Sequence, residues 1–269
     1  MDDTDATDAF DFEIVPKRPH HAAGAADAIY LANGYRPDAS SRERHRALLT
    51  TQVARFPEGQ FVAVTVSPAG GSAAVHGALV VGTATTMVTA RPPTATPLPW
   101  HEVVGDYGLP NHDPQGTWLY GVEIAVHPAY QRRGIGTALY RARLELVEAL
   151  HLEGWYAGGM LMGYYRYAAV LSPRAYGEQV IEGVLEDPTV TMQMRRGLEP
   201  AGIIEDYYPE PKAGNCAVLL TWRPAPVPRS AAPRATIATP RRRPAHAAIR
   251  TGERAGNAAI GRTRGSARR

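Results

Sequence analysis

Residues 123–154, EIAVHPAYQRRGIGTALYRARLELVEALHLEG, predict a strand, a short glycine loop and a helix in that order. The first four residues are mostly apolar, and Pro128 breaks the run because proline fixes its own φ and disfavours helix in the residue before it. From Thr137 onward the pattern is helical, with apolar residues on one face: Ile135, Leu139, Ala142 and Leu146. We expect the charged residues, Arg143 among them, on the opposite face and Gly154 as the helix stop.

This order of elements predicts a binding site for an anion. The first amides of a helix have no partner within the helix, and the helix dipole places partial positive charge there. Gly134 and Gly136 allow close approach of the main chain to a ligand, and Arg132 and Arg133 add charge. The dinucleotide pattern GxGxxG would need glycine at Leu139, and the Gly-Lys-Ser/Thr of a P-loop is absent from the sequence. A pyrophosphate is the expected ligand, and a glycine turn without a ligand is the alternative.

The run V-x-P-x-Y-Q-R-R-G-I-G-x-A-L contains a segment, residues 131–136, that resembles the Q/R-x-x-G-x-G/A signature of the GNAT N-acyltransferase superfamily. A closer likeness runs through A-G-G-M-L-M-G-Y-Y-R-Y-A, S-P-R-A-Y and the final A-V-L-L-T-W. These segments resemble the acetyltransferase domain that some bacterial proteins carry fused to a carbon-nitrogen hydrolase. We expect the hydrolase part to be absent from this chain.

The resemblance implies an α/β (α+β) fold, in which a mixed, mainly antiparallel sheet lies between helices. The expected strands cover residues 10–14, 60–66, 78–89, 117–126, 155–162, 203–208 and 216–222, and the last two are expected to pair. It also implies acetyl-CoA as acyl donor, with its pyrophosphate on the main-chain amides of the glycine loop, Gln131, Arg132, Arg133, Gly134, Ile135, Gly136 and Thr137. The pantetheine arm would bind along Ile124, Ala125 and Val126, and an amide near Val126 would stabilise the oxyanion.

Glu123 is the candidate general base. It is a carboxylate within an otherwise apolar strand, where burial would raise its pKa toward a useful value. Many GNAT enzymes carry a glutamate near this point of the fold. The alternatives are a glutamate at a strand edge that faces solvent, or one that pairs with an arginine.

The general acid is not marked by the sequence. In many GNAT enzymes a tyrosine four residues before a Gly-Phe pair protonates the departing thiolate. Here Gly197-Leu198 is the counterpart, and Gln193 stands at the tyrosine position. The candidates that could substitute are three tyrosines: Tyr164, Tyr165 and Tyr167. The alternative is that these are packing or substrate-pocket residues.

Composition limits the remaining possibilities. The chain has 269 residues, 44% of them hydrophobic, and one cysteine, Cys216, which excludes an internal disulfide and fits a reducing cytoplasm. The acidic start MDDTDATDAF is not a secretory signal, and no stretch approaches the ~20 apolar residues of a membrane span. His101-Glu102 lacks the second histidine of a zinc motif, so no metal is expected. Residues 91–116, with six prolines, are expected to form a flap on the substrate side.

We expect three regions: an acidic, disordered N-terminus (1–9), a GNAT-like domain (10–223) and a disordered basic tail (224–269). The tail holds eleven arginines and one glutamate, a charge of +10. The whole chain carries +3, so the rest of the chain carries −7. Its composition offers too little apolar surface to offset the entropy of ordering. It could make weak, salt-sensitive contacts with nucleic acid, or be a solvated extension.

The sequence thus predicts a cytoplasmic N-acetyltransferase that moves acetyl from acetyl-CoA to a primary amine. The acidic body favours cationic amines as acceptors. The alternatives are a non-catalytic regulator that binds acyl-CoA and a nucleic-acid-associated protein that binds through its tail. A homodimer formed through the last strands is compatible with the sequence.

Overall fold

A computed structural model describes residues 10–66 and 78–225 of the chain. The predictions of disorder for 1–9 and for the basic tail concern residues that lie almost entirely outside this part. Seven strands form one sheet: β1 (Phe12–Pro16), β2 (Gln60–Thr65), β3 (Val80–Thr89), β4 (Trp118–Val126), β5 (Gly154–Met160), β6 (Glu199–Ile204) and β7 (Ala217–Trp222). The main helices are α1 (Ala22–Ala32), α2 (Ala39–Arg55), α3 (Trp100–Val104), α4 (Ile135–Ala149), α5 (Pro173–Ile181) and α6 (Val190–Met194).

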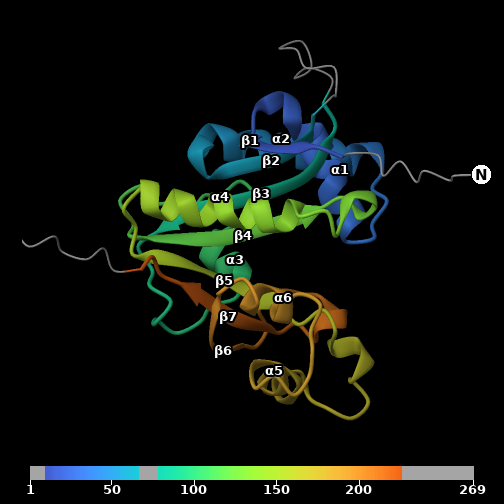
Figure 1. Ribbon diagram of the computed structural model, residues 1–269, viewed down its shortest axis with the longest axis vertical. Helices are drawn as coiled ribbons and strands as arrows, with labels where there is room; N and C mark the ends of the chain where they lie inside the picture. The colour runs from blue at the N-terminus through green and yellow to red at the C-terminus, as the bar shows by residue number, and fades with distance from the viewer. Residues whose placement is uncertain (1–9, 67–77, 226–269) are drawn as a thin grey trace, which may run out of the picture. The chain divides into compact units, whose positions relative to one another are not determined.

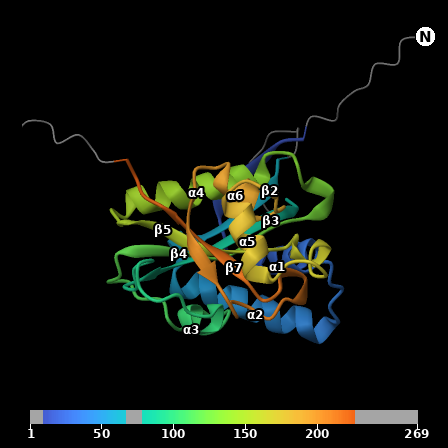
Figure 2. The ribbon, with the colours of Figure 1, turned by 90° about the horizontal axis from the view of Figure 1, so that it is seen from below.

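The sheet lies between two layers of helices (Figures 1 and 2). One face packs against α4, α5 and α6 through a core that includes Tyr140, Trp155 and Val190. The other face packs against α1, α2 and α3, with Trp100 and Met87 among the buried residues. Two glycines allow the close packing: a Cβ on Gly82 would lie 2.9 Å from Ile135 of α4, and one on Gly24 would lie 2.9 Å from Val80.

The strand order is β1-β2-β3-β4-β5-β7-β6, and β4 with β5 is the parallel pair among otherwise antiparallel neighbours. This confirms the predicted mixed, mainly antiparallel sheet between helices. β4 and β5 pair only from Trp118 to Tyr120 on β4 and from Gly154 to Tyr156 on β5. Beyond that point β4 continues beside β3 and β5 continues beside β7, so the two strands diverge.

Local expectations differ from the structure at several points. Gly154 begins β5 and does not stop α4, which ends at Ala149. The strand expected at 203–208 is β6, Glu199–Ile204, which pairs with β7 as expected. The stretch 91–116 contains the short helix α3, in which Trp100 is buried. Five residues leave too little periodicity to mark a helix in a proline-rich sequence.

The position of Arg143 is the difference from expectation that matters for function. It was expected on the solvent side of α4, and it is instead 2% exposed. It stands four residues after Leu139 and four before Val147, both buried, so its position on the helix is on the core face. The sequence favours a surface position for this arginine because buried arginines are rare without a partner.

Candidate active site

The loop before α4 has an open, left-handed turn. Gly134 adopts φ +86° and Arg132 adopts φ +62°, and α4 begins at Ile135. A Cβ on Gly134 would meet nothing within 4 Å, and one on Gly136 would meet only Val126, at 3.9 Å. Both glycines therefore face open space, which a ligand can occupy without a side chain in between.

The amides of this loop are free of main-chain partners. In the described part of the chain, no turn or loop hydrogen bond between main-chain atoms has a donor from residues 132–137, and the first amide to donate is that of Ala138, to the Gly134 carbonyl at 3.0 Å. No side chain caps the helix. The helix thus presents unpaired donors and partial positive charge at its N-terminal end.

Three arginines surround these amides. The guanidinium of Arg133 lies over the rings of Phe10 and Tyr130, at 4.9 and 5.7 Å from their centroids, which limits where its charge can lie. Arg132 is exposed. The third is Arg196, which follows α6 and donates from Nη2 to the Thr137 hydroxyl at 3.0 Å. Arg196 was not expected here, because it is remote from the loop in sequence and follows a different helix.

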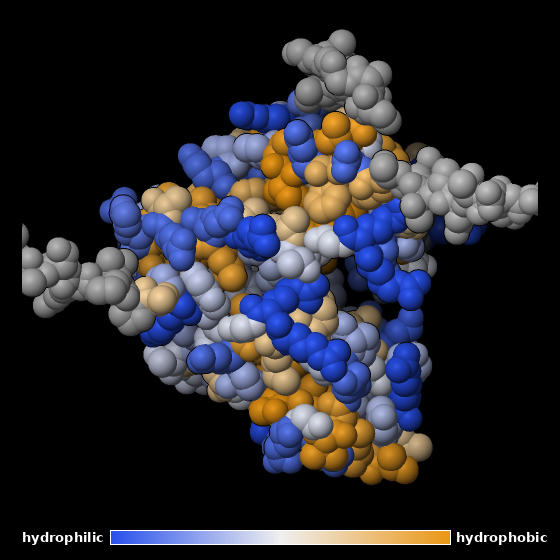
Figure 3. Space-filling model, viewed as in Figure 1, coloured by the Kyte–Doolittle hydropathy of each residue, from blue (hydrophilic) through white to orange (hydrophobic). Residues whose placement is uncertain are grey.

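The predicted pantetheine segment is the free edge of β4. Gln131 Nε2 donates to the carbonyl of Val126 at 3.2 Å, which ties the glycine loop to the end of the strand. From Gly121 to Val126 the strand pairs with β3 alone. In the space-filling view the surface is hollowed just below the loop that leads into α4, on the side toward which β4 and β5 run (Figures 1 and 3).

Glu123 follows an irregularity in β4. The register between β3 and β4 shifts so that Thr85 pairs with Glu123 while Thr86 pairs with Gly121, and Val122 has no partner. The carbonyl of Val122 accepts a hydrogen bond from Trp100 Nε1 at 3.2 Å. A bulge of this kind re-aims the side chain that follows it. Glu123 is half-buried, and its Oε2 is buried without a hydrogen-bond partner.

A group of buried polar side chains lies around Glu123. We call it the Glu123 cluster, and its members come from five elements or connections: Lys17, Gln52, Thr85, Glu123 and Arg143. Lys17 Nζ donates to the Thr85 hydroxyl at 3.1 Å, and that hydroxyl donates to Gln52 Oε1 at 3.0 Å. Gln52 Nε2 in turn donates to the carbonyl of Tyr107 at 2.7 Å.

Arg143 connects α4 to the same place from the other face of the sheet. Its Nη2 donates to the carbonyl of Thr85 at 3.2 Å and also to the carbonyl of Glu123. These two residues are cross-strand partners. Arg143 therefore satisfies main-chain acceptors at the irregular part of the sheet and brings a positive charge close to the Glu123 carboxyl group.

Burial changes the ionisation of the cluster. Removal from water raises the pKa of Glu123 to about 7, against the opposing pull of the charges on Lys17 and Arg143. Burial also lowers the pKa of Lys17 to about 7 and that of Arg143 to about 10. Glu123 is thus a carboxyl group that titrates near neutral pH, which is the property a general base needs.

Aromatic side chains lie beside the carboxyl group. Tyr107 and Tyr208 place their hydroxyls 3.3 Å apart, and the ring of Trp100 lies 4.7 Å from that of Tyr107. Burial, and after it the Glu123 charge, raises the pKa of Tyr107 well above its usual value. These aromatics come from the α3 region and the β6–β7 connection, so sequence patterns alone did not bring them to Glu123.

The three tyrosines proposed as general acid lie in another neighbourhood. The hydroxyl of Tyr164 donates to the Leu171 carbonyl at 3.1 Å, that of exposed Tyr165 accepts from Arg166, and the ring of Tyr167 lies 5.1 Å from that of Tyr176. Within the described residues, no hydrogen bond or ring contact joins Tyr164, Tyr165 or Tyr167 to Glu123. Their catalytic role stays a prediction.

Gln193, at the position of the family tyrosine, has a tyrosine as its partner. Its Nε2 lies 2.6 Å from the hydroxyl of Tyr140, which is buried on α4, while its Oε1 is buried without a partner. A Cβ on Gly159 of β5 would lie 2.3 Å from that Oε1. Gln193 therefore bonds a buried tyrosine hydroxyl of α4.

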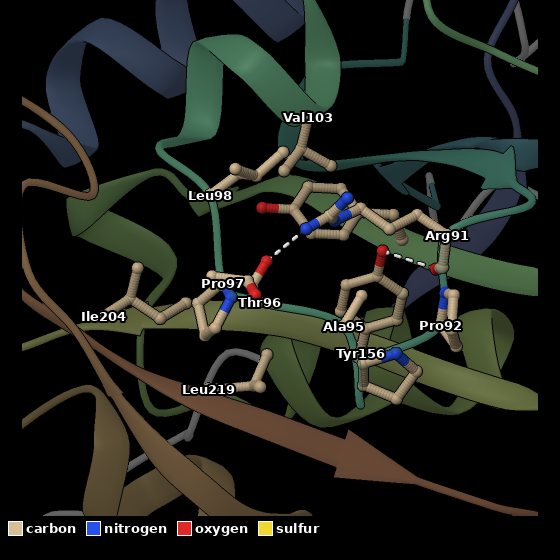
Figure 4. Close-up of a pocket in the computed structure, with 12 residues that line it drawn as sticks. Arg91, Pro92, Ala95, Thr96, Pro97, Leu98, Val103, Tyr156, Ile204 and Leu219 are labelled. Atoms are coloured by element: carbon tan, nitrogen blue, oxygen red, sulfur yellow. Dashed lines mark hydrogen bonds between the residues drawn. The ribbon is translucent and has the colours of Figure 1, made fainter.

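A shallow pocket lies under the proline-rich stretch (Figure 4). Arg91 to Leu98 form one wall, and Tyr120, Tyr156 and Leu219 belong to the sheet behind it. The guanidinium of Arg91 donates to the Thr96 carbonyl, and the Tyr156 hydroxyl donates to the Arg91 carbonyl at 2.9 Å. These bonds fold the stretch onto the sheet at Tyr120 and Tyr156, which is where β4 and β5 begin to diverge. The flap predicted for residues 91–116 stays a prediction.

Two further searches of the described residues bear on function. No group of three or more His, Cys, Asp or Glu side chains in residues 10–66 and 78–225 is placed to hold a metal ion. In the same ranges, no helix combines the length and the apolar character that a membrane span requires. Cys216 is buried, as expected of a packed position next to a strand.

Comparison with known proteins identifies the family. The model of the acetyltransferase (GNAT) family matches residues 78–161. The chain is 31% identical over 175 residues to the uncharacterized N-acetyltransferase YkwB of Bacillus subtilis (strain 168), a match that covers 65% of this chain and 73% of YkwB. This chain belongs to the GNAT acetyltransferase family. It is an acyltransferase, and the predicted family resemblance is confirmed.

Other similarities agree with this assignment and cover different shares of the proteins concerned. The chain is 30% identical over 178 residues to "Probable hydrolase YhcX" of the same organism; the match covers 66% of this chain and one third (33%) of YhcX. Among solved structures, the GNAT-like decarboxylase GphF in complex with isobutyryl-CoA superposes with a TM-score of 0.56 at 24% identity, covering 78% of this chain and 98% of GphF. This last likeness shows the fold.

Proposed function

We propose that this GNAT acyltransferase transfers an acetyl group from acetyl-CoA to a primary amine by direct attack, with Glu123 as general base. The observation that carries the proposal is the presence of two features along the second half of β4. Unpaired amides lie at the start of α4, and a carboxyl group with a pKa near 7 follows the bulge in the same strand.

The glycine loop supplies the binding site for the CoA pyrophosphate. Donors from residues 132–137 have no main-chain partner, and Gly134 and Gly136 leave open space in front of them. Arg132 and Arg133 add charge from the loop, and Arg196 adds it from beyond α6. A doubly charged diphosphate gains from both the helix dipole and the full charges. A GNAT-like structure solved with isobutyryl-CoA supports an acyl-CoA as the donor.

The free edge of β4 positions the thioester. Ile124, Ala125 and Val126 have main-chain groups on the side that β5 has left, and these can bond the pantetheine amides as a neighbouring strand would. An amide near Val126 is the proposed donor to the oxyanion. Holding the amine and the thioester in register removes much of the barrier to aminolysis.

In the reaction the amine nitrogen attacks the thioester carbon, and Glu123 accepts a proton from that nitrogen. The carbon–sulfur bond then breaks, and the thiolate of CoA leaves and takes up a proton. Tyr164, Tyr165 and Tyr167 are the candidate donors of that proton. Replacing each by Phe tests them: loss of a general acid lowers kcat by about 10²-fold or more, and an unchanged kcat in all three variants would remove them from the mechanism.

The test of function is CoA release. Purified protein is incubated with acetyl-CoA and a panel of amines that spans polyamines, lysine-like amines, aminoglycosides and peptide N-termini, and free thiol is measured. We expect turnover with at least one cationic amine, because the chain outside the basic tail carries −7. Tight calorimetric binding of acetyl-CoA with no release over the panel would instead support a non-catalytic acyl-CoA-binding regulator.

A further inference from the structure

The chain contains two lysines among its 29 lysine and arginine residues, Lys17 and Lys212, and they lie in opposite environments. Lys212 is exposed, whereas Lys17 is fully buried, at 0% exposure. Lys17 follows β1 directly, and its own amide donates to the Gln60 carbonyl at 2.8 Å, so the backbone holds it beside β2. In a chain that mostly uses arginine for positive charge, the most buried basic side chain in the described part is therefore a lysine.

The side chain of Lys17 reaches the neighbourhood of Glu123 through Thr85. Thr85 is the direct cross-strand partner of Glu123, so their side chains emerge on the same face of the sheet at adjacent positions. Lys17 Nζ donates to the Thr85 hydroxyl. The lysine nitrogen and Glu123 thus share Thr85 as a neighbour, through its hydroxyl and through strand pairing respectively, and Glu123 Oε2 is buried without a hydrogen-bond partner.

Lysine and arginine have different uses at such a place. An arginine stays charged in proteins, whereas the pKa of a buried lysine shifts readily. Arg143 supplies the permanent charge, bonded to two main-chain carbonyls. Lys17 has one hydrogen-bond acceptor, the Thr85 hydroxyl, where an ammonium group could use three. A buried lysine with a single acceptor is suited to gaining and losing its proton.

We propose that Lys17 is a positioning residue for the general base. Its positive charge stabilises the ionised form of Glu123, and the Glu123 carboxylate in turn stabilises the charged form of Lys17, because both groups lie next to Thr85. This rests on the proposed role of Glu123 and deepens it. When Lys17 is protonated, Glu123 is a carboxylate able to take a proton from the acceptor amine. Without the lysine charge, only Arg143 opposes the rise that burial causes in the Glu123 pKa. Glu123 then keeps its proton to higher pH.

The other groups around the pair do not replace this charge. On the α4 side stands Arg143, whose pKa of about 10 leaves it charged at neutral pH with or without Lys17. On the α2 side stands buried His45, whose pKa is lowered by burial and then by Lys17. Tyr107, from the α3 side, has a raised pKa and is neutral. Tyr208, from the β6–β7 connection, places its hydroxyl 3.3 Å from that of Tyr107. Near Lys17 stands buried His21, whose pKa burial lowers to about 4, so it is neutral at neutral pH. Within this set, Lys17 is the cation that titrates near Glu123.

The two-lysine composition allows a direct test by NMR, independent of catalysis. In full-length protein carrying ¹³C-labelled lysine, the Cε signals of Lys17 and Lys212 are followed as a function of pH, and K17M assigns them. We expect Lys17 to titrate well below the usual range of a lysine, at about pH 7. We also expect Glu123→Gln to shift the Lys17 midpoint down by about one pH unit, because the partner carboxylate is lost. An unchanged midpoint in Glu123→Gln would overturn the proposal, whatever the enzyme's activity.

The matching kinetic test uses K17M with K212M as control. We expect the acidic limb of the kcat/KM profile to move to higher pH by about one unit in K17M and to stay in place in K212M. Circular dichroism shows whether K17M is folded; if it is not, K17R, which keeps the charge, is expected to retain the wild-type limb. A K17M limb at the wild-type pH would refute the role of Lys17. Absence of any amine acetylation by the wild-type protein would contradict the proposed function. The NMR titration would still decide whether Lys17 and Glu123 interact.

Discussion

The glycine loop and the Glu123 cluster lie at opposite ends of the second half of β4 and are built in contrasting ways. The loop is exposed, its charges come mainly from neighbouring residues, and its donors have no main-chain partners. The cluster is buried apart from half-buried Glu123, its members come from β3, β4, α2, α4 and the end of β1, and most of its polar atoms are bonded. We propose the first as a binding surface for the acyl donor and the second as a site of proton transfer, which the fold forms without a ligand.

Because of this difference, we expect substitutions in the two regions to affect different properties of the protein. A change in the loop is expected to affect ligand affinity and to leave the fold intact, because the space around the glycines is open. A change in the cluster is expected to affect ionisation, turnover or stability, because each buried polar group there depends on the others. The following substitutions test that separation, in order of decreasing expected effect.

Glu123→Gln is expected to have the largest effect. Turnover should fall by about 10²–10⁴-fold, the usual contribution of a general base, with little change in acetyl-CoA affinity. Because burial raises the pKa of Glu123 to about 7, the wild-type rate should decline as pH falls through 7 and Glu123 becomes protonated. The variant should lack this limb, so the loss is largest at and above neutral pH. Glu145→Gln, at an exposed position of α4, is the matched control; a pH–rate profile that Glu123→Gln leaves unaltered would remove Glu123 from the mechanism.

Gly136→Asp should weaken acetyl-CoA binding by about 100-fold or more, since it places a negative charge within a few ångströms of the proposed diphosphate site. The fold should tolerate it, because the nearest atom to a Cβ at this position is 3.9 Å away and an acidic residue in the first turn of a helix is favourable. Calorimetry measures the affinity and thermal unfolding measures the stability. Gly136→Ala, which adds the Cβ without the charge, is the control. Unchanged affinity in Gly136→Asp would refute the placement of the ligand.

Arg143→Met tests the cluster as a part of the fold. It removes a buried donor to the carbonyls of Thr85 and Glu123, and it should lower the free energy of unfolding by about 2–4 kcal/mol. Arg141→Met, two residues away on the exposed side of α4, should change it by less than about 0.5 kcal/mol. Urea unfolding compares the two. Equal stabilities would show that Arg143 contributes nothing that its exposed neighbour lacks.

Tyr164→Phe should lower stability less than Arg143→Met, and it lies in a region remote in contacts from both sites. It removes one hydrogen bond, from the hydroxyl to the Leu171 carbonyl, and about 1 kcal/mol of unfolding free energy. Tyr165→Phe, at a side chain that is 53% exposed, should leave the stability unchanged. A loss of acetyl-CoA affinity in Tyr164→Phe would contradict the separation, because it would link this region to the glycine loop.

Much of the fold could be predicted from sequence because its signals are local. Alternation of apolar residues marked the first strand, largely apolar runs marked most of the others, and the spacing of Ile135, Leu139 and Leu146 marked α4. The family resemblance also covered roughly residues 10–223, with specific motifs only in the central stretch. What failed was equally local in cause: α3 is five residues long, and β6 carries glycine and proline, so neither has the periodicity that identifies an element.

The glycine loop was determined by the sequence itself, because an amide donor set at the start of a helix depends only on consecutive residues and on the open turn that two glycines permit. The surroundings of Glu123 were decided by tertiary structure alone. Lys17, Gln52, Thr85 and Arg143 are spread over 127 positions of the chain, and no spacing relates them. They meet because a bulge turns Glu123 inward, Thr85 stands opposite it, and two helices close from opposite faces of the sheet. The acidity of a buried carboxyl group depends on those neighbours and on the exclusion of water, and both exist only after the chain has folded.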